Sequence, residues 1–106
     1  GDPSRIDRLH ADWRRGDAEA LWTAMGEEMR REHPALYRRM NAERNRAWLP
    51  QLEARLAPAA GDADTLVVVG ALHLLGEDGL VALLRGEGYR VRRLCADCPQ
   101  AAPDGR

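Results

Sequence analysis

The sequence predicts an α/β fold, with three helices in residues 3–57 followed by a β-α-β unit in residues 65–94. Two observations favour this class. In the first half, apolar residues recur at intervals of three and four positions, which is the helical period. Residues 65–69 (Thr-Leu-Val-Val-Val) are instead a continuous apolar run, typical of a strand that is buried on both faces.

The first two helices follow directly from spacing and from the residues at their ends. Ile6, Leu9 and Trp13 share one face of a helix that begins at Pro3, and Gly16 ends it. Asp17 can then cap the N-terminus of a second helix, which we expect to reach about Arg31.

The third helix begins at Pro34, because proline suits the first turn of a helix, and it runs towards Ala57. Pro50 lies inside this span and should kink the helix or start a new one. Residues 58–64 form a turn-rich linker. The apolar face of this helix is predicted to contain Tyr37, Met40, Arg44 and Trp48.

The second half is predicted to contain a strand over residues 65–69, a helix over residues 79–85 and a second strand over residues 89–94. A glycine-rich loop, residues 70–79, joins the first strand to the helix, and Asp78 can cap that helix. Strands connected in this way are parallel.

Two parallel strands make a poor sheet, and the apolar strand over residues 65–69 needs neighbours on both sides. We therefore expect residues 1–98 to be a half-domain, either part of a larger α/β fold or completed by oligomerisation with a second copy. Residues 99–106 are predicted to be a disordered tail.

Charge and hydropathy exclude two classes of partner. The 106 residues carry a net charge of −1, which gives no field that would attract nucleic acid. No apolar run approaches the roughly 20 residues needed to span a bilayer, so no transmembrane segment is expected. The polar start, Gly1-Asp2-Pro3-Ser4, does not resemble a signal peptide.

Cys95 and Cys98 form a lone C-x-x-C pair near the C-terminus. Two thiols cannot complete a tetrahedral metal site. A surface disulfide, two idle thiols and a small redox module remain open from the pattern alone. The pair favours an oxidising compartment.

His73 is the residue most suited to chemistry, because it follows the buried strand by a few residues. Ligands of α/β sheets bind at the carboxyl ends of strands, and Gly70 lets the chain leave the strand tightly. Neutral imidazole is a common metal ligand and a general base. The alternative is a packed, hydrogen-bonded loop histidine.

Arg44 and Asn45 form a second candidate site. Arg44 falls on the apolar face of its helix, where a guanidinium needs a carboxylate, a carbonyl group or a bound anion as partner. Asn45 can orient a ligand or a water molecule. The alternative is that Arg44 extends from the edge of that face into water and that Asn45 is solvated.

Taken in order, these motifs resemble the C-terminal half of the TraB/GumN family, which also includes the Tiki metalloproteases. The resemblance covers residues 13–94. The motifs that carry it are Gly16-Asp17, P-x-L-Y at 34–37, R-N-x-x-W at 44–48, V-V-V-G-A-L-H-L-x-G at 67–76, D-G-L at 78–80 and G-Y-R-V at 88–91.

The resemblance implies a metal-dependent hydrolase of peptidase type that uses a divalent ion, manganese or cobalt, with zinc also possible. His73 and Gly70 match the second of two G-x-x-H motifs, whose histidine is a metal ligand, and Gly76 lies in the same loop. Arg44 and Asn45 match a catalytic Arg/Asn element.

The first G-x-x-H and an acidic residue would then lie in an N-terminal half that this chain does not contain. Its partner would be that half or a second copy, and the isolated chain would be inactive. A periplasmic or extracytoplasmic location is also implied. A different function class stays open, namely a non-catalytic interaction module that self-associates or pairs through a free sheet edge.

Overall fold

A computed structural model of the protein describes residues 3–95, and every regular element in this range is helical. Two of the elements, η1 and η2, are π-helical, whereas η3 and η4 are single 3₁₀ turns. In chain order the elements are α1 (Pro3–Arg15), α2 (Ala18–Leu21), η1 (Trp22–Glu27), α3 (Glu28–Glu32), α4 (Pro34–Tyr37), η2 (Arg38–Ala42), α5 (Glu43–Leu56), η3 (Pro58–Ala60), η4 (Ala71–His73) and α6 (Leu80–Gly86).

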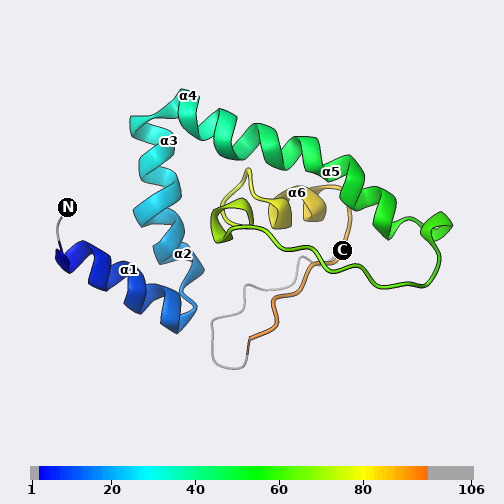
Figure 1. Ribbon diagram of the computed structural model, residues 1–106, viewed down its shortest axis with the longest axis horizontal. Helices are drawn as coiled ribbons and strands as arrows, with labels where there is room; N and C mark the ends of the chain where they lie inside the picture. The colour runs from blue at the N-terminus through cyan, green and yellow to red at the C-terminus, as the bar shows by residue number, and fades with distance from the viewer. Residues whose placement is uncertain (1–2, 96–106) are drawn as a thin grey trace.

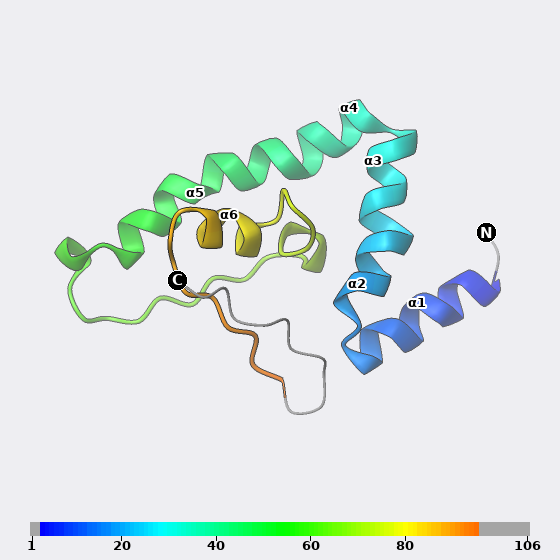
Figure 2. The same ribbon diagram turned by 180° about the vertical axis from the view of Figure 1, so that it is seen from behind.

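Two long helical runs set the architecture (Figures 1 and 2). One run consists of α2, η1 and α3, and the other, made of α4, η2 and α5, crosses its end at a steep angle. The loop 70–79 and α6 lie in the angle between them. The turn η4 contacts both η1 and η2, and α6 packs against α5. This arrangement holds the loop that carries His73 against both runs.

The helical predictions for the first half are confirmed. α1 has the predicted bounds, and the Asp17 side chain caps the next helix by accepting a hydrogen bond of 3.1 Å from the Ala20 N–H. The run that starts at Pro34 passes Pro50 within a single helix, α5, so no new helix begins there.

The inward face of the third run differs from the predicted one by one residue. Met40 is 49 % exposed and Arg44 is exposed, whereas Asn41 is 5 % exposed and Asn45 is 0 % exposed. The cause is η2, since a π-helical turn contains more residues than an α-helical turn. A period of 3.6 residues counted from Tyr37 falls between positions 40 and 41 and then on position 44, but the wider turn brings positions 41 and 45 inward.

The predicted α/β fold is wrong for the residues that the structure describes. Residues 65–69 and 89–94 form no strand and no β-α-β unit. A β-branched run favours extended backbone, but a strand also needs a neighbour whose N–H and C=O groups face its own. Instead one side of residues 65–69 faces α5, and the other is exposed, with Leu66 at 89 % and Val68 at 83 %.

The helix predicted over residues 79–85 is present as α6, and its first residue, Leu80, is only 3 % exposed. Its N-cap is Gly79 rather than Asp78. Asp78 does not cap this helix because its carboxylate and its carbonyl oxygen bond to the third helical run instead.

The predicted tail over residues 99–106 and Cys98 lie outside the described residues, whereas Cys95 is disulfide-bonded. None of the helices within residues 3–95 is long and apolar enough to cross a lipid bilayer.

The Trp22 ring fills the contact between the first helical run and the loop 70–79. It packs against Gly76 and Gly26, where a Cβ atom would collide with the indole, and its centroid lies 6.0 Å from the Tyr37 ring. The guanidinium carbon of Arg30 lies over the same Trp22 ring, 5.5 Å from its centroid. Gly76 also has a φ of 75°, a conformation that favours glycine.

Gly76→Ala should lower the free energy of unfolding by about 2–5 kcal/mol, because left-handed strain of about 1–2 kcal/mol adds to overpacking of about 1–3 kcal/mol. A Cβ at this position would lie 2.7 Å from the Trp22 ring. Gly88→Ala is the matched control, because Gly88 also has a positive φ, of 95°, but has no atom within 4 Å of such a Cβ. Urea unfolding measures both, and equal losses would contradict the packing role of Trp22.

Candidate functional site

The candidate site lies between η2, α5 and the loop 70–79. His73 is the last residue of η4, a turn closed by a hydrogen bond of 3.0 Å from the His73 N–H to the Gly70 carbonyl oxygen. Gly70 itself has an ordinary extended conformation, with φ −63° and ψ 149°. The conformation of residue 70 therefore does not require glycine, contrary to the expectation that Gly70 lets the chain turn tightly after residues 65–69. The turn η4, which follows, directs His73 towards α5.

The Asn45 side chain is fully buried and links the helix to the loop. Its Nδ2 donates to Asn41 Oδ1 over 2.7 Å and to the Asp78 carbonyl oxygen over 2.8 Å. Its Oδ1 lies 2.8 Å from His73 Nδ1. The geometry places Asn45 next to His73, and its contacts are with protein groups.

This network fixes the tautomer of His73. A carbonyl oxygen can only accept, so the Asn45 atom that faces the Asp78 carbonyl must be Nδ2, and Oδ1 must face His73. His73 Nδ1 therefore carries the proton and donates it to Asn45. In the neutral imidazole, Nε2 then holds the lone pair, and no described residue uses it.

Two residues that the sequence did not assign to the site, Asn41 and Tyr37, support this arrangement. Asn41 accepts from Asn45 and donates to the Leu72 carbonyl oxygen over 3.3 Å, so it bonds to both sides of the site. Tyr37 donates its hydroxyl hydrogen to the Asp78 carboxylate over 3.0 Å. The only signal in the sequence was the spacing of Tyr37, Asn41 and Asn45, four residues apart each time, which is typical of one helix face.

The Tyr37 hydroxyl keeps its proton to an unusually high pH. Burial raises its pKa from 10.0 to about 12, and the hydrogen bond to the negatively charged Asp78 acts in the same direction. Asp78 is held from the other side by Arg46, at 3.4 Å. The carboxylate of Asp78 is therefore committed to structural contacts.

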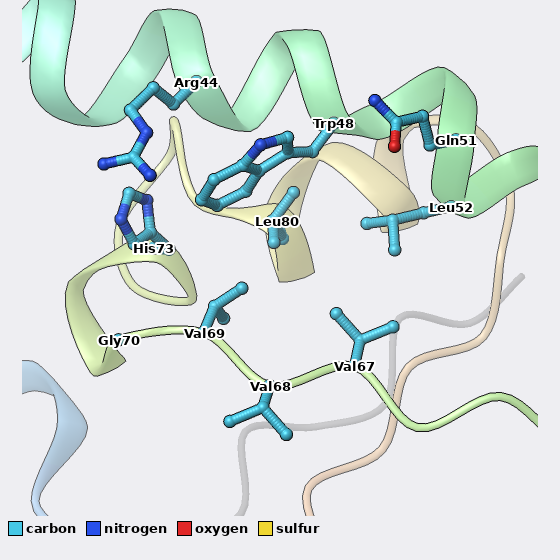
Figure 3. Close-up of a pocket in the computed structure, with 10 residues that line it drawn as sticks. All are labelled: Arg44, Trp48, Gln51, Leu52, Val67, Val68, Val69, Gly70, His73 and Leu80. Carbon is cyan, nitrogen blue, oxygen red and sulfur yellow. The ribbon is translucent and has the colours of Figure 1, made fainter.

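Arg44 lies beside His73 and is exposed, so of the two alternatives left open for it, extension into water rather than burial with a partner is the one observed. Its guanidinium carbon lies 4.9 Å from the centroid of the Trp48 ring, and the Trp48 and His73 ring centroids are 4.8 Å apart. Figure 3 shows the guanidinium next to the imidazole. Burial, and secondarily the charge of Arg44, lowers the pKa of His73, so the imidazole is neutral at neutral pH.

These side chains border a pocket of about 460 Å³. Figure 3 shows Val67 and Val69 pointing towards the side chains of α5, whereas Val68 points away. The lining consists of Arg44, Trp48, Gln51, Leu52, Val67, Val68, Val69, Gly70, His73 and Leu80. The pocket thus combines a polar end, at Arg44 and His73, with an aliphatic wall.

The structure brings Arg44, Asn45 and His73 together, while Gly76 lies on the Trp22 side of the loop. Residues 3–95 contain no group of three or more His, Cys, Asp or Glu side chains that could hold a metal ion. The described part of the chain therefore offers His73 as a single nitrogen ligand, with a hydrogen bond on its other nitrogen.

Comparison with known proteins identifies a family. The model of the TraB/PrgY/gumN family matches residues 1–93, which is most of the chain. No curated protein and no solved structure matches it. The match includes the helical runs, the loop 70–79 and α6.

The tautomer of His73 can be tested without any substitution. In ¹⁵N NMR spectra of the metal-free chain, at a pH where the imidazole is neutral, His73 should show a protonated Nδ1 and an unprotonated Nε2, because Asn45 Oδ1 can only accept. His33 is the internal control, since it is exposed and its ring makes no hydrogen bond among the described residues. A His73 spectrum with the proton on Nε2 would exclude the network.

The Tyr37 pKa predicts how stability depends on high pH. The folded chain holds the hydroxyl proton that the unfolded chain loses near pH 10.0, so this contribution to stability is lost as the pH rises towards about 12. In a Tyr89→Phe background, the tyrosinate absorbance of Tyr37 should appear near pH 12. Adding Asp78→Asn should move the midpoint to lower pH, and an unchanged midpoint would contradict the role of that hydrogen bond.

Proposed function

Because the chain belongs to the TraB/PrgY/gumN family, we propose that it forms part of a metal-dependent hydrolase of peptidase type, in which His73 supplies one ligand of a divalent ion. Manganese or cobalt is the expected ion, with zinc as a further candidate. The observation that carries the proposal is the hydrogen bond of 2.8 Å between His73 Nδ1 and Asn45 Oδ1, which leaves the Nε2 lone pair for the ion.

The chemistry of His73 fits this role. Metal-binding histidines usually donate their second ring N–H to a carbonyl, amide or carboxylate oxygen, which fixes the tautomer and the orientation of the ring. A neutral imidazole is also required, and the lowered pKa of His73 favours it. When bound, the ion would polarise a carbonyl group of the substrate and lower the pKa of a water molecule.

Asn45 acts in this proposal as a positioning residue. It is fully buried, and its amide is taken up by Asn41, Asp78 and His73, so it holds the proton on His73 Nδ1 rather than contacting a substrate. Arg44 is exposed at the pocket and keeps its guanidinium donors for a substrate oxygen.

One imidazole cannot hold a hydrolytic ion, so the proposal needs ligands from outside residues 3–95. They would come from another part of the same protein or from a second copy of the chain. The exposed side chains of Leu66 and Val68 give such a partner an apolar surface next to the pocket. An extracytoplasmic location belongs to the same proposal, and the disulfide-bonded Cys95 is consistent with it.

The test is a titration of the full-length protein with Mn²⁺ or Co²⁺. His73→Ala should weaken metal binding by at least about tenfold and abolish peptide hydrolysis, because a ligand is removed. His33→Ala, which changes an exposed histidine, should leave both unchanged. If His73→Ala binds the metal as tightly as the wild type, His73 is not a ligand and the proposal fails.

A further inference from the structure

Arg44 is an exposed cation with no anionic partner among residues 3–95. Two other arginines near the loop 70–79 are paired with acidic residues of that loop: Arg30 with Glu77 at 2.6 Å, and Arg46 with Asp78 at 3.4 Å. Arg44 makes no such ion pair in the described part of the chain, and its contact there is with the Trp48 ring. Its donors are therefore available for an anion from outside these residues.

Trp48 gives this cation a defined position. The guanidinium carbon lies 4.9 Å from the indole centroid, within the range of a cation–π contact. The same indole also lies against His73, with ring centroids 4.8 Å apart. Arg44 is thus held at the polar end of the pocket rather than extended along the helix surface.

The charge of the pocket favours an anionic ligand. Arg44 is its cation, and none of the lining residues among the described ones is acidic. A guanidinium binds a carboxylate through two parallel N–H···O bonds, which recognise its planar shape as well as its charge.

The wall opposite the polar end is aliphatic. Val67 and Val69 point into the pocket from the extended chain, and Leu52 and Leu80 face them from α5 and α6 (Figure 3). The volume of about 460 Å³ is large enough to hold an amino-acid residue. A branched side chain on the ligand would cover apolar surface that now faces water.

We infer that this pocket selects ligands in which a free α-carboxylate, bound by Arg44, adjoins a branched aliphatic side chain, bound by the wall of Leu52, Val67 and Val69. The C-terminal leucine, isoleucine or valine of a peptide has this chemistry. The inference rests on the proposed function, for which it names the substrate class: a peptide bound through its C-terminal residue next to His73.

N-acetyl-L-leucine is the probe, and the 106-residue chain without metal is the protein. Binding is followed by the NMR shift of the Trp48 indole N–H. N-acetyl-L-leucine should bind at least tenfold more tightly than N-acetyl-L-leucinamide, which lacks the charge, and than N-acetylglycine, which lacks the side chain. Free L-leucine should bind more weakly than the acetylated form, because its ammonium group approaches Arg44.

Arg44→Gln should weaken the binding of N-acetyl-L-leucine at least tenfold and leave that of the leucinamide unchanged. Arg39→Gln is the control, because Arg39 is exposed on the same helical run and does not line the pocket. Equal affinity for the acid and the amide, or no saturable binding of N-acetyl-L-leucine, would overturn the inference. This assay needs no metal, so such a result would leave the His73 ligand proposal standing. Conversely, unchanged metal affinity of His73→Ala would end that proposal without altering the measured selectivity.

Discussion

The buried amide of Asn45 is the constraint on which the site depends. A side-chain amide removed from water needs partners for its N–H groups and for its oxygen, or its burial becomes costly. Asn45 finds them in the Asn41 side chain, in the Asp78 carbonyl group and in the His73 imidazole. One amide therefore connects a helix, a loop backbone and a ring, and a shift of the loop 70–79 would leave a buried polar group without a partner.

The other side of the loop is held by contacts of a different kind. Gly76 packs on the Trp22 indole, where there is no room for a Cβ atom, and Tyr37 bonds to Asp78 while its ring meets the same indole. The loop is thus fixed by hydrogen bonds on one side and by aromatic packing on the other. Loops gain the precision needed for a ligand site when a rigid scaffold holds them in this way.

The sequence predicted the helices well because their signals are local: Asp17 caps one, Pro34 begins another, and apolar spacing marks the faces. It could not predict the π-helical turn η2, which reversed the roles of Arg44 and Asn45 by bringing Asn45 inward. The strands were wrongly predicted because β-branched residues determine an extended backbone, whereas a sheet also depends on neighbours that a run such as residues 65–69 does not reveal. His73 was found by its motif, but Asn41 and Tyr37, which bond to Asn45 and to Asp78, lie far from it in the chain and were marked only by their spacing from Asn45 along one helix face.

The reversal of Arg44 and Asn45 also explains how the site can keep a neutral histidine beside a cation. A buried Arg44 would have needed an acceptor such as a carboxylate, and a carboxylate beside His73 would have favoured a protonated imidazole. Because Asn45 occupies the buried position, His73 receives a neutral acceptor, while the exposed Arg44 adds a positive charge that lowers the pKa of the imidazole further. The same placement leaves the charge of Arg44 uncompensated at the pocket. The inward placement of Asn45 and the outward placement of Arg44 therefore have two consequences: Nε2 of His73 stays free of a proton, and the pocket is prepared for an anionic ligand.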